Sequence, residues 1–254
     1  MAGSVTSILM YHSVSDRGGA TAISPSVFAM QMRVLAESGV PVLTLDGWTD
    51  ARRAGTLPER SVVITFDDGF EDFGDAAWPV MQAHGFRPIV YLPTGFVGRD
   101  EGWRGIASPP RALMGWARIA ALAEEGVLFG SHTVSHPDLD ALPAEAQLAE
   151  LTVAKRAIET KLHAPVRHFA PPYGLADAGV RRRIAGLYDT SVGTRLGQAG
   201  GGDDLHDLPR IEMFYFTDEG RWRDHLAGRG GAYLATRRLL RAVKGAAMKP
   251  WAGL

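Results

Sequence analysis

The residues of this sequence that could carry chemistry begin with two adjacent carboxylates. Asp67 and Asp68 follow the apolar run of residues 62–66. Further along the chain, His132 and His136 stand four positions apart. One carboxylate and two imidazoles are enough to hold a zinc ion and leave coordination positions open for water. The other carboxylate could then accept a proton from that water. The spacing therefore predicts a metal centre suited to hydrolysis.

Each half of this pattern also has an ordinary structural interpretation. Asp67, Asp68 and Gly69 together are good turn residues after a strand. Two histidines at this spacing can be one buried and one exposed side chain with no shared role. Pro137 directly follows His136, which favours a loop or a first helical turn over the middle of a helix. The prediction of a metal centre therefore depends on the combination.

A third candidate segment runs from Arg167 to Gly174 and contains two prolines followed by a tyrosine. Arg167 could pair with a carboxylate and keep it ionised. The backbone N–H of Tyr173 could face a developing oxyanion, and Pro172 would make the preceding turn rigid. The alternative is that Arg167 is a surface charge and Tyr173 only packs at a rim.

Apolar runs of strand length alternate with amphipathic stretches of helix length, which indicates a mostly parallel sheet with helices outside it. The predicted strands cover residues 7–11, 40–45, 61–66, 88–92, 126–130, 166–170, 188–192 and 207–211. The predicted helices cover residues 24–38, 73–84, 116–125, 144–163 and 176–185. Segments 94–115, 193–204 and 214–231 are expected to be loops.

Such a sheet can close into a barrel, and active sites of barrels lie at the rim formed by the C-terminal ends of the strands. Four sets of candidate residues directly follow predicted strands: His12, the Asp67 and Asp68 pair, His132, and Pro172 with Tyr173. Their common position at one rim supports a shared site. The sequence contains no internal repeat and no linker, so residues 1–254 are expected to form one domain.

Composition sets further limits on function. Of the 254 residues, 46% are hydrophobic and 22% are charged, which is typical of a globular domain. A net charge of −1 provides no overall field for binding nucleic acid. Cysteine is absent, so disulfides and thiolate ligands are excluded and any metal must have nitrogen and oxygen ligands. No run of about 18 apolar residues predicts a transmembrane helix.

The two ends of the chain bear on its location. The first residues have neither the basic segment nor the apolar core of a signal peptide. A complete chain would then be cytoplasmic, whereas a chain from which a leader was removed would be exported. The tail over residues 237–254 is basic and contains leucines. We expect a terminal helix packed on the barrel with a solvated basic face, and weak contact with an anionic membrane surface is the alternative.

Three segments together resemble the first motifs of the polysaccharide deacetylase family, the NodB-homology domain of carbohydrate esterase family four. They run from Thr65 to Gly69, from His132 to His136 and from Arg167 to Tyr173, in the family's order. The resemblance covers roughly residues 8–211. It implies a distorted (β/α)7 barrel of the α/β class. It also implies metal-dependent removal of an acetyl group from an N-acetylated sugar in a polysaccharide, an oligosaccharide or a glycan precursor.

The resemblance assigns roles residue by residue. Asp67 would be the catalytic base, Arg167 would hold that base in place, and the backbone amide of Tyr173 would face the oxyanion. The metal ligands would be Asp68, His132 and His136. The ion would be divalent, most readily Zn²⁺, with Co²⁺, Ni²⁺ or Fe²⁺ as alternatives for this ligand set.

The sequence departs from the common family pattern near its C-terminal end. Most members have a leucine-x-histidine motif whose histidine is the general acid, but residues 207–211 contain no histidine. His206 would lie at the wrong end of that strand. The segment ending at His12 instead resembles the branch that acts on poly-N-acetylglucosamine-like exopolysaccharides, in which an N-terminal histidine is the acid. His12 is therefore the expected general acid, and a mere neighbour of the metal is the alternative. Arg210 would contact the substrate or Asp67.

The expected partner is an N-acetylated glycan or glycan precursor. Rim aromatics could stack on its sugar rings, and the expected substrate-binding residues are Arg210, Pro172, Trp103 and Tyr215. Two other functions stay open at this point: a non-sugar amidohydrolase that cleaves a linear or cyclic amide on the same scaffold, and an inactive metal-containing carbohydrate-binding module. A carboxylate base beside the metal ligands argues against the binding module, which has no need of one.

Overall fold

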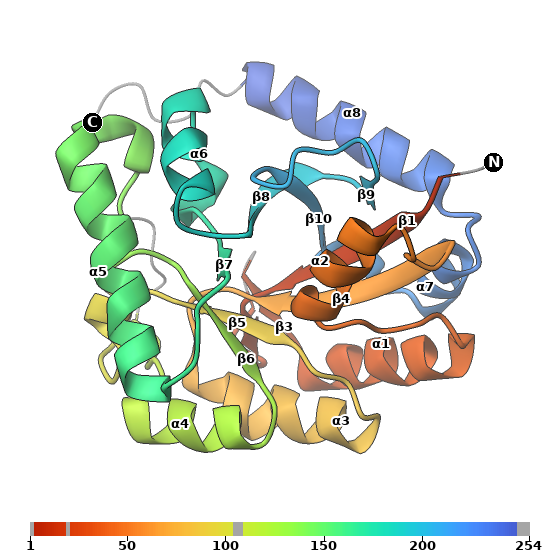
Figure 1. Ribbon diagram of the computed structural model, residues 1–254. Helices are drawn as coiled ribbons and strands as arrows, with labels where there is room; N and C mark the ends of the chain where they lie inside the picture. Colours follow the sequence, from red (N-terminus) through yellow and green to blue (C-terminus); the bar gives the residue numbers. More distant parts are fainter. Residues whose placement is uncertain (1–2, 19–20, 104–108, 248–254) are drawn as a thin grey trace.

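Seven parallel strands form a closed barrel in the computed structural model, which describes residues 3–18, 21–103 and 109–247 (Figure 1). Pairing runs in the order β1, β4, β5, β6, β7, β8 and β10, and β10 pairs with β1 to close the ring. These strands are β1 (Val5–Tyr11), β4 (Arg60–Phe66), β5 (Ile89–Leu92), β6 (Leu128–Ser131), β7 (His168–Phe169), β8 (Thr190–Leu196) and β10 (Leu208–Glu212). The predicted distorted (β/α)7 barrel is confirmed.

Helices surround the barrel (Figure 1). They are α1 (Pro25–Ser38), α2 (Leu45–Ala54), α3 (Trp78–Ala83), α4 (Trp116–Glu124), α5 (Ala144–Leu162), α6 (Ala178–Ala185), α7 (Glu219–Leu226) and α8 (Gly231–Ala247). The five predicted helices are present, although the one predicted over residues 73–84 begins as a π-helical turn, η1 (Phe73–Ala77). Helix α1 illustrates the end signals: the Ser24 side chain caps its first turn, and Gly39 ends it at φ 69°.

The strands are buried on both faces, so their sequences are almost continuously apolar. Successive side chains point to opposite faces of a strand. In β1, Ile8 therefore packs with Val63 and Tyr91 in one cluster, whereas Leu9 belongs to the larger cluster that includes Phe28 of α1. This double burial is the reason why short apolar runs located most strands correctly.

The predicted strand over residues 40–45 is wrong. Only Val42 pairs there, through an isolated parallel bridge to Val62. The Thr44 hydroxyl accepts a hydrogen bond from the Gly47 N–H at 3.0 Å, and helix α2 begins at Leu45. The N-cap at Thr44 therefore ends the extended chain after a single paired residue. Helix α2 contributes Trp48, whose side chain is fully buried against the start of β1.

Two predicted loops contain regular structure. In segment 193–204, β8 continues to Leu196, and β9 (Ala199–Gly200) then pairs antiparallel with β1. Segment 214–231 contains most of the 3₁₀ turn η5 (Met213–Phe216) and all of α7, which Asp218 caps by accepting from the Arg221 N–H at 2.8 Å. Segment 94–115 is mainly irregular, with a short turn η2 (Thr94–Phe96), and its residues 104–108 lie outside the described residues. The other small elements are β2 (Ser13–Val14), β3 (Ala22–Ile23), η3 (Leu139–Ala141) and η4 (Pro172–Gly174).

Helix α8 packs on the barrel, as predicted for the terminal helix. It packs through the buried Leu234, and Arg241 pairs inward with Glu212 at 3.2 Å. Its exposed side carries Arg238 together with Leu239 and Leu240, and the two leucines are 66% and 52% exposed. Residues 248–254 of the predicted tail lie outside the described residues. Among the described helices, none combines the length and apolarity needed to cross a lipid bilayer.

A buried histidine makes stability depend on pH. His225 Nε2 lies 2.9 Å from Ser7 Oγ, and burial lowers the pKa of His225 to about 4. The unfolded chain takes up this proton near pH 6.5 but the folded chain only near pH 4, so the free energy of unfolding falls as the pH decreases between these values. We expect this histidine to contribute a loss of about 3 kcal/mol over that window. Urea unfolding of His225→Gln should show a shallower pH dependence, whereas exposed His84→Gln should retain the wild-type slope.

Candidate metal centre and active site

The chain turns sharply where β4 ends, and this turn separates the two neighbouring carboxylates. Asp68 and Gly69 both adopt positive φ angles, 71° and 72°. A Cβ at position 69 would also lie only 2.7 Å from a methyl of Leu92, so the turn needs glycine for both reasons. Asp67 and Asp68 are each 4% exposed, but they contact different partners. One carboxylate is thus available to a metal while the other faces a cation on β10.

Asp68, His132 and His136 come together as the sequence predicts. Asp68 Oδ1 lies 3.5 Å from His132 Nε2 and 3.4 Å from His136 Nε2. One ligand atom from each of the three residues falls within 4.8 Å of the others. Nδ1 of His132 lies 2.6 Å from the carbonyl of Ala170, to which it can only donate. In neutral His132 this leaves a lone pair on Nε2, directed at Asp68.

The chemistry of this cluster fits a divalent cation. Asp68 Oδ1 is buried and has no hydrogen-bond partner among the described residues. Burial also lowers the pKa of His136, which favours a neutral ring with a free lone pair. Burial alone would raise the pKa of Asp68, but the two imidazoles beside it hold that pKa far below its usual value. Converging electron-pair donors of this kind are costly to bury without a cation between them.

The segment that carries the histidines is a loop rather than a helix. Thr133 and His136 have positive φ angles of 71° and 54°. The Glu150 carboxylate, from α5, accepts hydrogen bonds from the N–H groups of Val134 and Ser135 at 2.7 and 3.0 Å. The Ser135 hydroxyl donates to the same carboxylate at 2.6 Å. This anchor holds the loop in its strained conformation and positions the second imidazole.

Asp67 forms a buried two-pronged ion pair with Arg210 of β10. The guanidinium nitrogens Nη1 and Nη2 lie 2.6 and 2.7 Å from the two carboxylate oxygens. Arg210 is only 1% exposed, and it also donates to Thr65 Oγ1 and to the carbonyl of Gly193. Burial would raise the pKa of Asp67, but the charge and hydrogen bonds of Arg210 outweigh burial and lower it. Asp67 is therefore held ionised, as a base must be.

His12 stands beside this pair at the end of β1. Its Nε2 lies 3.8 Å from Asp67 Oδ2, and its side chain is 22% exposed. The next residues are fixed by Asp72, whose carboxylate accepts from the Ser13 hydroxyl at 2.5 Å and from the Val14 N–H at 3.1 Å. The imidazole is thus partly open to solvent, next to the buried Asp67 carboxylate.

Comparison of sequences identifies the family. The profile of the polysaccharide deacetylase family matches residues 54–188, more than half of the chain. The chain belongs to the polysaccharide deacetylase family. A relative within it, the putative polysaccharide deacetylase YxkH of Bacillus subtilis strain 168, is 24% identical over 208 residues, which are 81% of this chain and 70% of that protein. The poly-beta-1,6-N-acetyl-D-glucosamine N-deacetylase of Escherichia coli strain K12 is 32% identical over 91 residues, 34% of this chain and 13% of that one.

Two solved structures are similar to this chain over most of its length. The deacetylase PplD of Streptococcus pyogenes, in complex with acetate, superposes with a TM-score of 0.73 at 25% identity, over 83% of this chain and 92% of that one. IcaB from Ammonifex degensii also gives a TM-score of 0.73, at 22% identity over 90% of this chain and 98% of that one. Because IcaB is only 22% identical to this chain, its similarity shows the fold alone.

The prediction that Arg167 holds Asp67 in place is wrong. Its guanidinium contacts Asp46 at 2.6 Å, Asp50 at 3.0 Å and Asp189 at 2.8 Å rather than Asp67. The physical reason is the length of β7, which consists of two residues and begins after Arg167. Arg167 therefore lies at the N-terminal end of the barrel, opposite the metal centre.

This network predicts a purely structural effect for Arg167→Ala. The side chains involved are one quarter to two thirds exposed, so solvent weakens each ion pair. We expect a loss of about 1–2 kcal/mol in the free energy of unfolding and an unchanged affinity for zinc. Urea unfolding and zinc titration of the folded variant would check both values. A variant of normal stability that binds zinc poorly would contradict this placement.

The predicted substrate-binding residues lie in different surroundings. Trp103 stacks on His136 with ring centres 4.3 Å apart, and Tyr173 meets the same imidazole edge-on at 4.8 Å. Pro172 is buried at the start of η4. The carbonyl of Tyr215 accepts from the Tyr233 hydroxyl of α8, so this residue is fixed by the C-terminal helix. Trp103 and Tyr173 thus border the metal centre directly.

The sequence left the partner of Arg210 open and gave no indication that Glu150 anchors the histidine loop. Arg210 was assigned to the substrate or Asp67, and its pairing decides for Asp67. An arginine inside an otherwise apolar strand is the signal, because a buried charge needs a partner. Glu150 could not be singled out from the sequence, because it is one of several glutamates in the helix α5.

Proposed function

We propose that this chain is a metal-dependent carbohydrate N-deacetylase that hydrolyses the acetamido group of an N-acetylated glycan or glycan precursor. The observation that carries the proposal is the convergence of Asp68, His132 and His136 beside the separately held Asp67. A binding module has no use for an ionised base next to a cation site. The names of the relatives support a sugar substrate, and two of them are named as acting on poly-N-acetylglucosamine.

Asp67 acts as the base in the proposed mechanism. A divalent ion at Asp68, His132 and His136, Zn²⁺ being our first choice, would polarise the acetamide carbonyl and lower the pKa of an adjacent water. Asp67 takes a proton from the water that attacks the carbonyl carbon. Arg210 keeps Asp67 ionised before this step and fixes its two oxygens during it.

Two further groups act on the tetrahedral intermediate. The backbone N–H of Tyr173 donates to the oxyanion, which suits the position of this residue against His136. His12, as an imidazolium, protonates the departing sugar amine, which is a poor leaving group without that proton. Bond cleavage then yields acetate and a free amino sugar.

Acetate release tests this proposal. Zinc-free and zinc-reloaded protein are incubated with N-acetylglucosamine oligomers, and acetate and new amino groups are both quantified. We expect equal amounts of the two products, only after zinc is restored. Zinc-loaded protein that releases acetate from a simple non-sugar amide but not from any N-acetylated sugar would contradict the proposal and favour an amidohydrolase.

The assigned acid makes a prediction about the pH profile. Activity requires an ionised Asp67 and a protonated His12, so the rate is expected to be bell-shaped in pH. The acid limb should lie below the usual range for a carboxyl group, because the pKa of Asp67 is lowered. We expect His12→Ala to lower kcat by about 100-fold and to remove the alkaline limb. An unchanged profile in a folded, zinc-binding His12→Ala variant would assign the acid to another group.

A further inference from the structure

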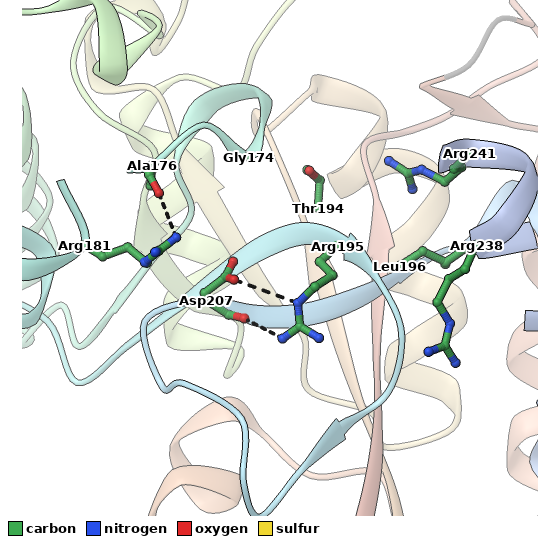
Figure 2. A pocket seen from close by; sticks show the side chains of 9 residues that line it. All are labelled: Gly174, Ala176, Arg181, Thr194, Arg195, Leu196, Asp207, Arg238 and Arg241. Carbon is green, nitrogen blue, oxygen red and sulfur yellow. Dashed lines mark hydrogen bonds and ion pairs between the residues drawn. The ribbon is translucent and has the colours of Figure 1, made fainter. Parts of the chain in front are cut away.

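A groove lies on the outside of the barrel over the end of β8, between α6 and α8 (Figure 2). Its volume is about 460 Å³, within the usual range for ligand sites. The floor comes from Thr194 to Leu196, and the walls come from α6 and α8. No helix separates β8 from the next barrel strand in the chain, so α6 and α8 leave this part of the strand open.

Arginines dominate this groove. Figure 2 shows four of them reaching it from three elements. They are Arg181, Arg195, Arg238 and Arg241. Among the described lining residues, Asp207 is the only carboxylate. Guanidinium groups in such number favour an oxyanion, because each can present two parallel N–H donors to a carboxylate or a phosphate.

The arginines retain donors for a ligand. Arg195 donates one nitrogen, Nη2, to Asp203 at 2.7 Å and to the carbonyl of Asp207 at 3.2 Å, and its Nε lies 3.8 Å from the Asp207 carboxylate. Arg241 contacts Glu212 at 3.2 Å. Arg181 donates to the carbonyl of Ala176 and lies 3.9 Å from Asp204. Each contact uses only part of a group that has five N–H donors. Arg238 is exposed and makes no ion pair or hydrogen bond with any residue that the structure describes.

The groove shares one chain segment with the metal centre. Gly174 lines the groove and directly follows Tyr173, whose ring contacts His136. Position 174 is tightly packed on β8, since a Cβ there would lie 2.2 Å from Thr194 Oγ1. The backbone therefore connects a residue that lines the groove directly to a residue that borders the metal centre.

We propose that this groove binds a carboxylate or phosphate group carried by the same glycan whose N-acetyl group lies at the metal centre. The inference rests on the proposed deacetylase function and narrows its substrate to an acidic glycan. The whole-chain charge of −1 gives no general attraction for polyanions, so recognition must come from this local cluster.

Binding without catalysis tests the groove by itself. Calorimetry would measure the affinity of an oligogalacturonate, which has carboxylates but no N-acetyl group, for the zinc-loaded protein. We expect Arg238→Ala and Arg195→Ala to weaken binding by about three- to tenfold each, with a strong dependence on salt. Arg156→Ala is the matched control, because Arg156 is exposed on α5 and outside the groove. No binding to wild type, or equal losses in Arg156→Ala and Arg238→Ala, would overturn the proposal.

Inorganic phosphate separates a small-anion site from a glycan site. If phosphate at equal concentration binds as tightly as the oligosaccharide and shows the same losses, the groove takes small anions and the glycan proposal is overturned. Tighter binding of the oligosaccharide supports it.

Turnover gives the second readout. We compare kcat/KM for a neutral N-acetylglucosamine oligomer with that for an oligomer in which glucuronate alternates with N-acetylglucosamine. The double variant Arg195→Ala/Arg238→Ala should lose about tenfold on the acidic substrate and remain unchanged on the neutral one. Equal values for the two substrates in wild type would overturn the groove while leaving the deacetylase function standing. Absence of turnover on both would contradict the deacetylase function, and the calorimetry would still decide whether the groove binds the acidic saccharide.

Discussion

Asp68→Ala is expected to abolish zinc binding at the metal centre and to lower acetate release by at least about 10³-fold, since metal polarisation supplies several kcal/mol to such reactions. Asp68 is the only carboxylate of the three-residue cluster found among the described residues. Its removal leaves two imidazoles and no negative charge to compensate the ion. The losses in binding and in rate should therefore appear together.

Thermal unfolding gives a second, independent readout of the same change. Zinc that binds the folded state raises the stability of wild type by mass action. This zinc-dependent increase in Tm should vanish in Asp68→Ala. Zinc-free Asp68→Ala should itself unfold at a lower temperature than zinc-free wild type, because residue 68 has φ 71°, so the readout is the change in Tm that zinc causes within each protein.

Asp68→Asn is the matched control for shape. Residue 68 has φ 71°, which alanine tolerates less well than aspartate or asparagine. Asparagine keeps the turn and one carbonyl oxygen but loses the charge. We expect it to fold like wild type and to bind zinc at least about tenfold more weakly. Wild-type zinc affinity in Asp68→Asn would show that these atoms are not the ligands.

The barrel and the convergence of Asp68, His132 and His136 could be predicted from the sequence because local signals agree with the fold there. Runs such as residues 61–66 are buried on both faces of a strand, so hydrophobicity alone locates them. Asp68 and His132 closely follow the ends of β4 and β6, where a parallel barrel gathers its loops, and His136 lies four residues after His132 in the same loop. The strand predicted over residues 40–45 is wrong for a local reason: Thr44 caps helix α2, and this N-cap outweighs the apolar run before it.

The partner of Asp67 could not be predicted in the same way. Asp67 and Arg210 are 143 positions apart, and they meet only because β10 returns to pair with β1, the neighbour of β4 in the barrel. Arg167 was assigned from its place in a motif, which gives no side-chain direction. The two-residue strand β7 puts it at the opposite end of the barrel. Ring closure, rather than local pattern, therefore determines which arginine holds the base.

Replacing Arg210 with methionine tests this assignment and should have a large effect on both rate and stability. Methionine fills much of the same volume but leaves the Asp67 carboxylate buried without its cation. Breaking a buried pair in this way costs about 3–5 kcal/mol of unfolding free energy. Burial raises the pKa of Asp67 and Arg210 lowers it, so the loss of Arg210 should raise this pKa. Without Arg210 the base takes up its proton at higher pH, so the acid limb of the rate profile should move upward and kcat should fall by about 100-fold or more.

The double variant Asp67→Asn/Arg210→Met separates the structural from the catalytic part of this effect. Asparagine needs no counter-charge, so the double variant should recover much of the stability that Arg210→Met loses, while activity stays absent because the base is gone. Arg167→Ala should show neither the shifted acid limb nor the rescue. If instead Arg210→Met kept the wild-type pH profile and Arg167→Ala displaced it, the base would be controlled from the N-terminal end of the barrel. A direct contact could not explain such coupling, because Arg167 is bound to Asp46, Asp50 and Asp189 there.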